Sequence, residues 1–323
     1  MRSLSQERRD LVDAVVAEST ASGITAGLLE KDEHLTDALR AIFSLPLEHV
    51  RLVFAGGTSL SKAHGLIERM SEDVDIKVEF IGEAAGLSRH KQKKQLGIIR
   101  DQIVGALGDL GLEQDADKKV TLNDRRYMHT QWAYERAYGG VASLRPNLQI
   151  ELVTRPLTLE PVPCTLVSLA DRMTSRAGQP FQVLTVSVAE TQAEKVLSFL
   201  RRFAQHRAGK MQQSWDSALV RHIYDVHCIH ASRPELVSKS LTAFDSLVQG
   251  DKDEWGTQHP EFAEDPYAVL RESLASSRVD AQTRNEYERN LLPLVYGDFK
   301  PHFDEAFVSF EAVASALLAT AQH

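Results

Sequence analysis

Residues 51–80 read RLVFAGGTSLSKAHGLIERMSEDVDIKVEF, and this stretch decides the fold that the sequence predicts. The apolar run LVFA predicts a buried strand, which the glycine pair after it ends. Thr58 or Ser59 then supplies a hydroxyl that can cap a helix, whose apolar positions continue to about Met70. In the segment 74–80, apolar and polar residues alternate, which predicts a second strand.

Two carboxylates, Asp73 and Asp75, lie two positions apart where the second strand begins. Because side chains alternate across a strand, both are expected on one face. Such a pair can bind a hard divalent cation such as Mg²⁺, which prefers oxygen ligands and keeps several waters. The turn before the helix offers backbone N–H groups and hydroxyls to a phosphate chain, and its residues are Gly56, Gly57, Thr58 and Ser59. Together these features are typical of nucleotidyl or phosphoryl transfer.

The composition of the 323-residue chain is that of an ordinary globular protein, with 43% hydrophobic residues. A net charge of −8 argues against a protein that coats nucleic acid indiscriminately but allows a local basic face. The two cysteines, Cys164 and Cys228, lack metal-site spacing, so neither a zinc site nor a disulfide framework is expected. No apolar run is long enough for a membrane span and no signal peptide is evident, so we expect a cytoplasmic protein without membrane partners.

Two amphipathic helices are predicted ahead of the opening stretch, at about 4–22 and 24–45. Four consecutive charged residues in the second helix, 30–33, are interpreted as a solvated face. A further helix is predicted at 88–110, and its first turns carry the most basic run of the chain, 89–94. This run is either a solvent-facing surface or a contact for the phosphates of a nucleic-acid acceptor.

Three antiparallel strands are predicted next, at 118–121, 127–133 and 148–154, joined by polar turns. The last of them carries one acid, Glu151, within an apolar pattern. Taken by itself, this side chain can simply face solvent on the outer side of the sheet.

A last short strand is predicted at 181–186, after which the periodicity is helical. The sequence therefore predicts an α/β domain over 1–180, with a mixed sheet and flanking helices, and a mainly helical domain over 181–323. Within the second domain, the polar segment 250–265 is expected to be an exposed loop. The basic run 201–210 is expected to be solvated or to contact an acceptor.

Two charged residues of the helical domain have ordinary interpretations. Lys195 can be a surface lysine whose stem follows its helix. Asp225 lies four residues after Arg221, which is the spacing of an ion pair on a helix surface.

The order strand, Gly-Gly-Thr-Ser, helix and Ser-x-Asp-x-Asp strand resembles the signature of the nucleotidyltransferase superfamily typified by polymerase β. This version is more similar to the AbiEii/MenT family of toxins from bacterial toxin–antitoxin pairs. Two later motifs of that family are also matched, Ala-Glu-Lys at 193–195 and Arg-x-x-x-Asp at 221–225. The chain departs from the family pattern at Ser198, usually Ala, and at His222, usually Asp, which leaves the role of the latter position open.

The resemblance implies a nucleotidyltransferase fold and the transfer of a nucleoside monophosphate from an NTP to a hydroxyl, with release of pyrophosphate. It implies that Asp73 and Asp75 bind Mg²⁺ and that Glu151 is the third carboxylate, which can accept the proton of the attacking hydroxyl. It further implies that Lys195 reaches the triphosphate as a mobile point charge and that Asp225 positions base, sugar or metal.

The resemblance also implies a toxin that is neutralised by a cognate antitoxin protein encoded beside it. In several relatives the acceptor is tRNA, modified at its 3′ end so that it cannot be charged, which blocks translation and growth. Ser71 lies beside the carboxylates, where phosphorylation by a partner would repel the triphosphate and compete for metal.

Three alternatives stay open. The acceptor hydroxyl can belong to a small molecule or to a protein instead of an RNA, or the chain can be a nucleotide-binding regulator without catalysis. The intact Asp73, Asp75 and Lys195 argue against the regulator. The basic runs favour a nucleic-acid acceptor over a small one.

Overall fold

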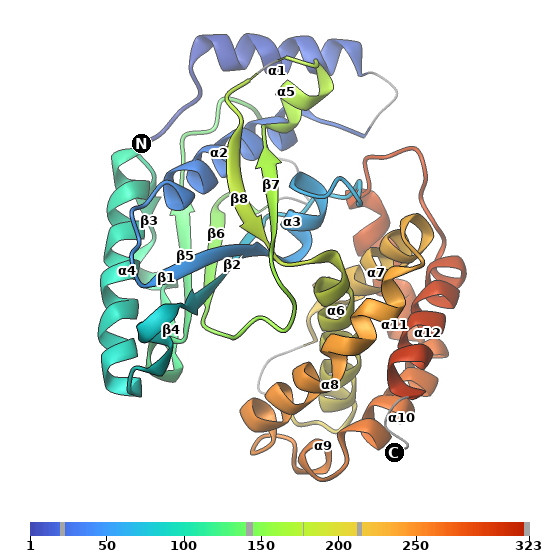
Figure 1. Ribbon diagram of the computed structural model, residues 1–323. Coiled ribbons are helices and arrows are strands. Elements are labelled where there is room, and N and C mark those ends of the chain that lie inside the picture. The colour runs from blue at the N-terminus through green and yellow to red at the C-terminus, as the bar shows by residue number, and fades with distance from the viewer. Residues whose placement is uncertain (20–22, 140–144, 177, 212–214, 320–323) are drawn as a thin grey trace. The chain divides into compact units, whose positions relative to one another are not determined.

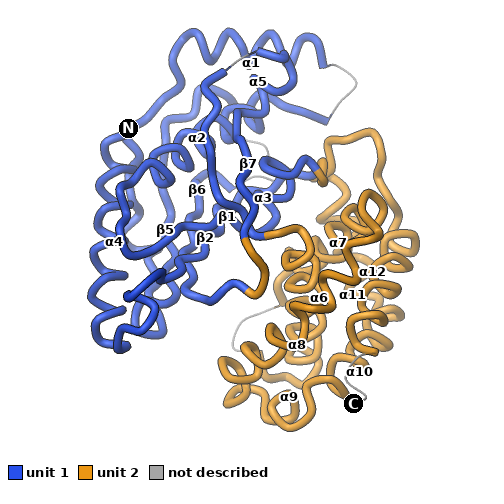
Figure 2. The backbone as a smooth tube through the Cα atoms, viewed as in Figure 1, with its two compact units in different colours: residues 1–65, 69–157, 161–186 blue, residues 66–68, 158–160, 187–323 orange. Residues whose placement is uncertain are grey.

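The structure is a computed structural model that describes residues 1–19, 23–139, 145–176, 178–211 and 215–319. The chain forms two compact units (Figure 2). The first holds residues 1–65, 69–157 and 161–186, and the second holds 66–68, 158–160 and 187–323. The division into a catalytic domain over 1–180 and a helical domain over 181–323 stays a prediction, and the strand at 181–185 lies in the first unit.

The first unit consists of one mixed sheet and flanking helices (Figure 1). Its strands are β1 (Val50–Ala55), β2 (Asp73–Phe80), β3 (Glu113–Gln114), β4 (Val120–Leu122), β5 (Tyr127–Ala133), β6 (Leu148–Val153), β7 (Val162–Leu166) and β8 (Phe181–Thr185). Its α-helices are α1 (Gln6–Glu18), α2 (Ala26–Phe43), α3 (Gly56–Lys62), α4 (Arg89–Asp109) and α5 (Leu169–Met173). Short 3-10 turns are η1 (Gly82–Gly86), η2 (Ala116–Lys118) and η3 (Asn123–Arg125).

The strands follow the order β3-β5-β6-β2-β1-β8-β7, with β4 beside β5. The central strand β2 has an antiparallel neighbour, β1, and a parallel neighbour, β6. Strand β5 runs antiparallel to β6, and β8 runs parallel to β1. The predicted fold class, a mixed α/β sheet with flanking helices followed by helices, is confirmed.

The main core of the first unit lies on one face of this sheet. Val74, Ile76 and Val78 of β2 are buried there with apolar side chains of β6, α2 and α4. Since side chains alternate along a strand, the odd-numbered positions of β2 project to the opposite face. That opposite face carries Asp73 and Asp75.

Helix α3 differs from the sequence-based expectation of a start at Thr58 or Ser59 and an end near Met70. It begins at the first glycine of the turn and ends at Lys62. The chain then turns through Gly65, whose φ of +62° is a left-handed conformation that glycine adopts without steric cost. The predicted cap was wrong, because the N-cap is Ala55 and the hydroxyls of Thr58 and Ser59 donate to the backbone carbonyls of Asp73 and Gly56.

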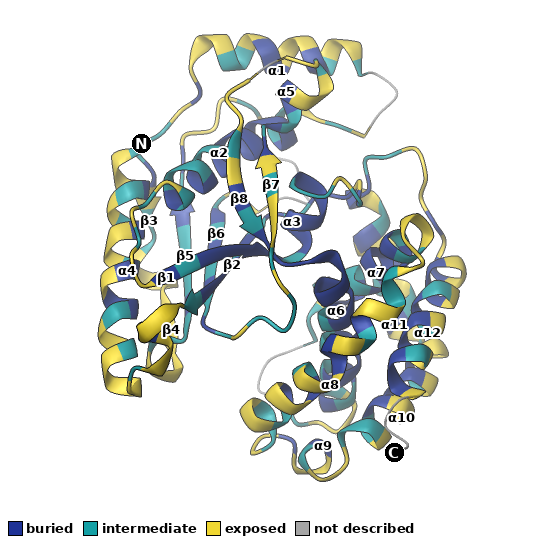
Figure 3. Ribbon diagram, in the orientation of Figure 1, coloured by how far each residue is buried: buried dark blue, intermediate teal, exposed yellow. Residues whose placement is uncertain are grey.

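Helix α2 shows that the predicted solvated face at residues 30–33 was wrong. Glu30, Lys31, Asp32 and Glu33 are only 1%, 1%, 8% and 5% exposed. Figure 3 shows α2 as largely buried, whereas α4 has an exposed outer surface. Successive residues point about 100° apart around a helix, so four of them can be buried only where neighbours surround it.

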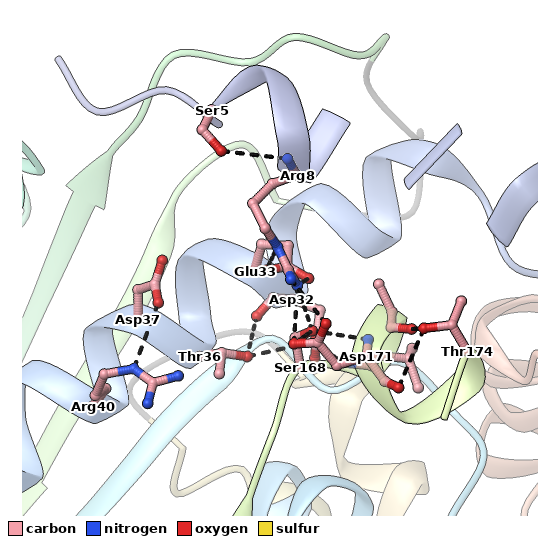
Figure 4. Close-up of polar contacts among 12 residues, drawn as sticks. Ser5, Arg8, Asp32, Glu33, Thr36, Asp37, Arg40, Ser168, Asp171 and Thr174 are labelled. Carbon is pink, nitrogen blue, oxygen red and sulfur yellow. Dashed lines mark hydrogen bonds and ion pairs between the residues drawn. The ribbon is translucent and has the colours of Figure 1, made fainter. Parts of the chain in front are cut away.

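Each of these four side chains contacts a different neighbour of α2. Glu30 accepts from the backbone of Ala137, Lys31 pairs with Glu72, Asp32 pairs with Lys62, and Glu33 pairs with Arg8. Figure 4 shows Arg8 reaching from α1 to Glu33 on α2 and to Ser168 and Asp171 at α5. Helix α2 therefore ties α1, α3, α5 and the start of β2 to one another.

The second unit is helical in its described residues. Its α-helices are α6 (Val188–Arg207), α7 (Arg221–Ser232), α8 (Leu236–Trp255), α9 (Pro260–Glu264), α10 (Pro266–Arg278), α11 (Ala281–Glu286) and α12 (Phe303–Leu318). Shorter turns are η4 (Ser217–Val220), η5 (Tyr287–Leu291) and η6 (Leu292–Leu294). The loop predicted at 250–265 was wrong, since α8 continues to Trp255 and α9 follows. Among the described residues, no helix has the length and apolar character that crossing a bilayer requires.

The basic run at 201–210 is not solvated throughout, contrary to expectation. Arg201 is 7% exposed and donates to Asp251 at 2.7 Å. Arg202 and Lys210 also form ion pairs with carboxylates of the second unit. Because these charges already have intramolecular partners, the run is a weaker candidate for acceptor binding than the run in α4.

Candidate active site

The register of β2 and β6 brings the predicted acids together. Asp73 lies opposite Gln149 and Asp75 lies opposite Glu151 across the parallel pair. Paired positions on neighbouring strands share a face, so the three carboxylates lie on the face that α2 and α4 leave uncovered. Asp73, Asp75 and Glu151 are all half-buried, which leaves them in reach of solvent.

The glycine turn lies directly against Asp75. Gly56 has a φ of +73°, and a Cβ built on it would be 1.8 Å from Asp75 Oδ2. A Cβ on Gly57 would be 2.7 Å from Arg69 Nη2 and 2.9 Å from Ser71 Oγ. At Gly56 the positive φ and the contact with Asp75 require glycine, whereas a side chain at Gly57 would have to displace Arg69 and Ser71, so the turn lies directly against the carboxylate face.

The two hydroxyls of the turn hold it in place. Thr58 is 1% exposed and donates to the backbone carbonyl of Asp73, with its oxygen 3.0 Å from Ser71 Oγ. Ser59 is fully buried and donates to the carbonyl of Gly56 at 2.9 Å. These bonds connect the start of α3 to the first residue of β2.

Glu151 has a direct partner on β5. Tyr127 donates its hydroxyl to Glu151 Oε2 at 2.9 Å. Burial of the Tyr127 ring, together with the nearby Glu151 carboxylate, raises the pKa of its phenol above the ordinary value. The tyrosine therefore stays protonated and serves as a hydrogen-bond donor to the acid.

An arginine that the sequence did not single out contacts the carboxylate face. Arg145 Nη1 donates to Asp73 Oδ1 at 2.8 Å and also to the side-chain oxygen of Gln149. The backbone of Arg145 is bound by the buried pair Lys31–Glu72. Apart from Gln149, the partners of Arg145 lie between 72 and 114 positions away in sequence, so no local pattern predicts these contacts.

Lys195 and Asp225 belong to the second unit, where they bind each other. Lys195 on α6 places its Nζ 2.6 Å from Asp225 Oδ2 on α7. Asp225 is fully buried and Lys195 is 6% exposed, so the surface lysine expected from the lone residue is wrong. The spacing of Lys195 and Asp225 in the sequence did not indicate that they contact each other.

The donor set of the first unit fits a hard divalent cation. Among the described residues, no group of three or more His, Cys, Asp or Glu side chains is arranged to hold a metal by itself. Mg²⁺, however, needs only one or two carboxylates when substrate phosphates and waters complete its octahedron. Asp73 and Asp75 provide such a pair, and a cationic group, the Arg145 guanidinium, already contacts Asp73.

The chain matches one protein family over most of its length. The family model described as "Nucleotidyl transferase AbiEii toxin, Type IV TA system" matches residues 37–309. Comparison with curated proteins returns no match.

Several solved structures are similar to this chain. MenT4, a nucleotidyltransferase toxin from Mycobacterium tuberculosis H37Rv, is 19% identical with a TM-score of 0.46, covering 98% of this chain and 99% of that one. A protein from H. pylori is 13% identical with a TM-score of 0.45, covering 93% and 100%. JHP933 from Helicobacter pylori is 13% identical with a TM-score of 0.39, covering 89% and 92%.

Proposed function

The chain belongs to the AbiEii family of nucleotidyltransferase toxins, and we propose that it transfers a nucleoside monophosphate from an NTP to an RNA hydroxyl, the 3′ end of tRNA. One observation supports the location of the proposed active site. Asp73 and Asp75 share a sheet face with Glu151 in register, against a turn whose Gly56 leaves no room for a Cβ beside Asp75. The family membership confirms the resemblance drawn from the motifs.

Asp73 and Asp75 are the proposed ligands of Mg²⁺. The bound ion supplies charge stabilisation to the transferring and leaving phosphates. The backbone N–H groups of the turn at Gly56 and Gly57 are the proposed donors to the β and γ phosphates. Thr58 and Ser59 contribute by fixing the turn, since their hydroxyls are engaged with backbone carbonyls.

Glu151 is the proposed base for the attacking hydroxyl. It lies opposite Asp75, and Tyr127 orients one of its oxygens by a hydrogen bond of 2.9 Å. A carboxylate held beside the reacting centre can accept the hydroxyl proton as the O–P bond forms, while the pyrophosphate leaves.

Lys195 is the proposed clamp on the triphosphate, and Asp225 is its support. The buried carboxylate of Asp225 holds the ammonium at 2.6 Å and so restricts a side chain with many rotamers. A positioned ammonium loses less entropy when it binds a phosphate, which is the reason to expect the pair to act as a unit.

The proposed RNA acceptor is supported by the basic run of α4. Arg89, Lys91 and Lys94 are exposed, and Lys93 forms an exposed ion pair with Asp124. The rest of the chain is acidic, so this local charge is suited to phosphate contacts instead of indiscriminate coating.

Neutralisation by an antitoxin is the proposed regulation, in keeping with the type IV toxin–antitoxin family. Ser71 is the proposed point of control, because its oxygen lies 3.0 Å from Thr58 Oγ1 and beside Gly57. A phosphate on Ser71 would place two negative charges next to the carboxylates. Mass analysis of toxin made together with its partner tests this: unmodified Ser71 in neutralised toxin would remove the regulatory proposal.

The experiment that tests the function is incubation of purified protein with total tRNA, Mg²⁺ and each labelled NTP in turn. Label in tRNA that is lost in Asp75→Asn supports the proposal and identifies the nucleotide. Asp75-dependent pyrophosphate release only with small hydroxyl compounds or protein extract moves the acceptor away from RNA. No Asp75-dependent turnover with any acceptor, despite NTP binding, overturns the transferase.

Salt dependence provides a second test of the acceptor. Phosphate contacts release counterions, so the affinity for tRNA should fall steeply between 50 and 200 mM salt, by roughly tenfold for every two phosphates that the protein neutralises. Filter binding at several salt concentrations measures this. An affinity for tRNA that salt leaves unchanged would contradict a phosphate-binding surface.

Replacing Tyr127 with phenylalanine is expected to lower transfer by up to about tenfold and the free energy of unfolding by about 1.5 kcal/mol, because one hydrogen bond to a charged group is lost. Steady-state transfer and urea unfolding measure the two effects. Tyr138→Phe is the matched control. It also removes a tyrosine hydroxyl that donates to a carboxylate, but its acceptors are Asp13 and the backbone carbonyl of Arg9, at α1 and not on the carboxylate face. Equal transfer by the two variants would contradict a role for Tyr127 in orienting Glu151.

A further inference from the structure

Arg145 places a positive charge on one of the two proposed metal ligands. Its Nη1 is 2.8 Å from Asp73 Oδ1 and also donates to Gln149, the residue opposite Asp73 on β6. The side chains of Arg145 and Asp73 are 43% and 36% exposed. The guanidinium therefore lies at the accessible edge of the carboxylate face, where solvent and ligands can compete with it.

The backbone of Arg145 is held from the other side of β2 by a buried ion pair. Glu72 accepts from the backbone N–H of Arg145 at 2.7 Å, and Lys31 donates to the carbonyl of the same residue at 2.8 Å. Lys31 and Glu72 also bind each other, with side chains only 1% and 3% exposed. The buried pair therefore binds both the N–H and the carbonyl of Arg145.

This arrangement fixes the backbone of Arg145 but leaves its side chain exchangeable. A buried ion pair is weak evidence of a stabilising function, because its desolvation cost offsets much of its attraction. Its geometric effect here is specific: Glu72 and Asp73 are consecutive, so the same short segment anchors the arginine backbone and receives its guanidinium.

The chemistry of the two partners favours exchange when a nucleotide arrives. Half-exposed ion pairs are weak, whereas guanidinium binds phosphate oxygens through paired, charge-assisted hydrogen bonds. A divalent cation on Asp73 would neutralise the carboxylate charge that attracts the guanidinium. The triphosphate that accompanies the cation offers the nearest new anion.

We propose that Arg145 is a further nucleotide-binding residue, whose guanidinium neutralises Asp73 in the free protein and turns to the phosphates of an NTP when Asp73 takes a divalent cation. The inference rests on the proposed function of the site and adds to it. Lys31 and Glu72 are then positioning residues, which hold the backbone from which the arginine acts.

The test is to measure two affinities of the full-length protein that the proposal moves in opposite directions. The first affinity is that for Mn²⁺ without nucleotide, measured from the EPR signal of free Mn²⁺. In Arg145→Gln it should tighten by about fivefold, because a competing cation is gone. The second affinity is that for a non-hydrolysable NTP in the presence of Mg²⁺, measured by calorimetry. In Arg145→Gln it should weaken by about tenfold or more. Arg145→Lys, which keeps the charge, should restore the wild-type Mn²⁺ affinity.

The matched control is Arg51→Gln. Arg51 pairs with Glu79 at the opposite end of β2, and the two side chains are 30% and 21% exposed, so the same charge and a similar ion pair are removed. Both affinities of this control should stay within about twofold of wild type. A general loss of structure in Arg145→Gln would weaken both affinities and so would not imitate the expected result.

The outcomes separate this inference from the proposed function. If Arg145→Gln binds Mn²⁺ no tighter than wild type, or NTP equally well, the role of Arg145 is overturned while Asp75-dependent transfer stands. If the wild-type protein binds no NTP, and Asp75→Asn leaves Mn²⁺ binding unchanged, the proposed site itself fails.

Discussion

Asp75→Asn is expected to reduce nucleotidyl transfer by on the order of 10³-fold, because it removes one of two carboxylates on which charge stabilisation at the phosphates depends. Asparagine has nearly the same shape, so it still fits against Gly56, where the space is too small for a single added carbon. The loss is therefore expected in turnover and in Mn²⁺ affinity. Transfer of labelled nucleotide under single-turnover conditions measures the first, and EPR measures the second.

The fold is expected to survive this change. Carboxylates that cluster on one face repel one another when no metal is bound, so removing one charge relieves repulsion. Asp73→Ala should also leave the fold intact, because its ion pair with Arg145 is half-exposed, and pairs of this kind contribute about 1 kcal/mol or less. Thermal melting in chelator measures this for both variants.

Glu79→Gln is the control for the activity of the Asp75 variant. Glu79 lies on the same strand and the same face as Asp75, and its charge is paired with Arg51 at the other end of β2. It should transfer nucleotide at close to the wild-type rate. Near-normal turnover of Asp75→Asn, or a large fall in its melting temperature without metal, would contradict the assignment of Asp75.

The sheet that carries the site could be predicted from local patterns. Each strand of the carboxylate face shows period-two alternation, which is sufficient to place Asp73, Asp75 and Glu151 on strand faces. The family resemblance, and not the alternation, indicated that β2 and β6 would be neighbours. Their pairing in register is a long-range result, since 76 positions separate Asp75 from Glu151 and no local rule relates them.

Helix α2 shows why the rest could not be predicted. A run of four charges is usually solvated, because burying a charge costs several kcal/mol unless it is paired. Here every partner comes from a distant segment, such as Arg8 for Glu33 and Lys62 for Asp32. The position of Arg145 was missed for the same reason: its importance depends on contacts with Asp73 that only the folded chain creates.

The burial of these charges leads to a second prediction with a large effect. Lys31→Met is expected to lower the free energy of unfolding by about 3–5 kcal/mol, because it leaves the Glu72 carboxylate buried without its cationic partner. Burial lowers the pKa of Lys31 and Glu72 opposes that shift, which agrees with a cation that depends on its partner. Urea unfolding, monitored by circular dichroism, measures this change in the free energy of unfolding.

Two further variants distinguish the ion pair from a general packing defect. Lys93→Met breaks a lysine–carboxylate pair on the exposed surface of α4, where solvent already screens both charges, and should leave stability unchanged. The double variant Lys31→Met/Glu72→Gln removes both buried charges, and its glutamine oxygen can still accept from the backbone of Arg145. It should therefore be more stable than Lys31→Met alone. Equal or additive destabilisation would mean that the cost arises from lost packing around α2 and not from the unpaired Glu72 carboxylate.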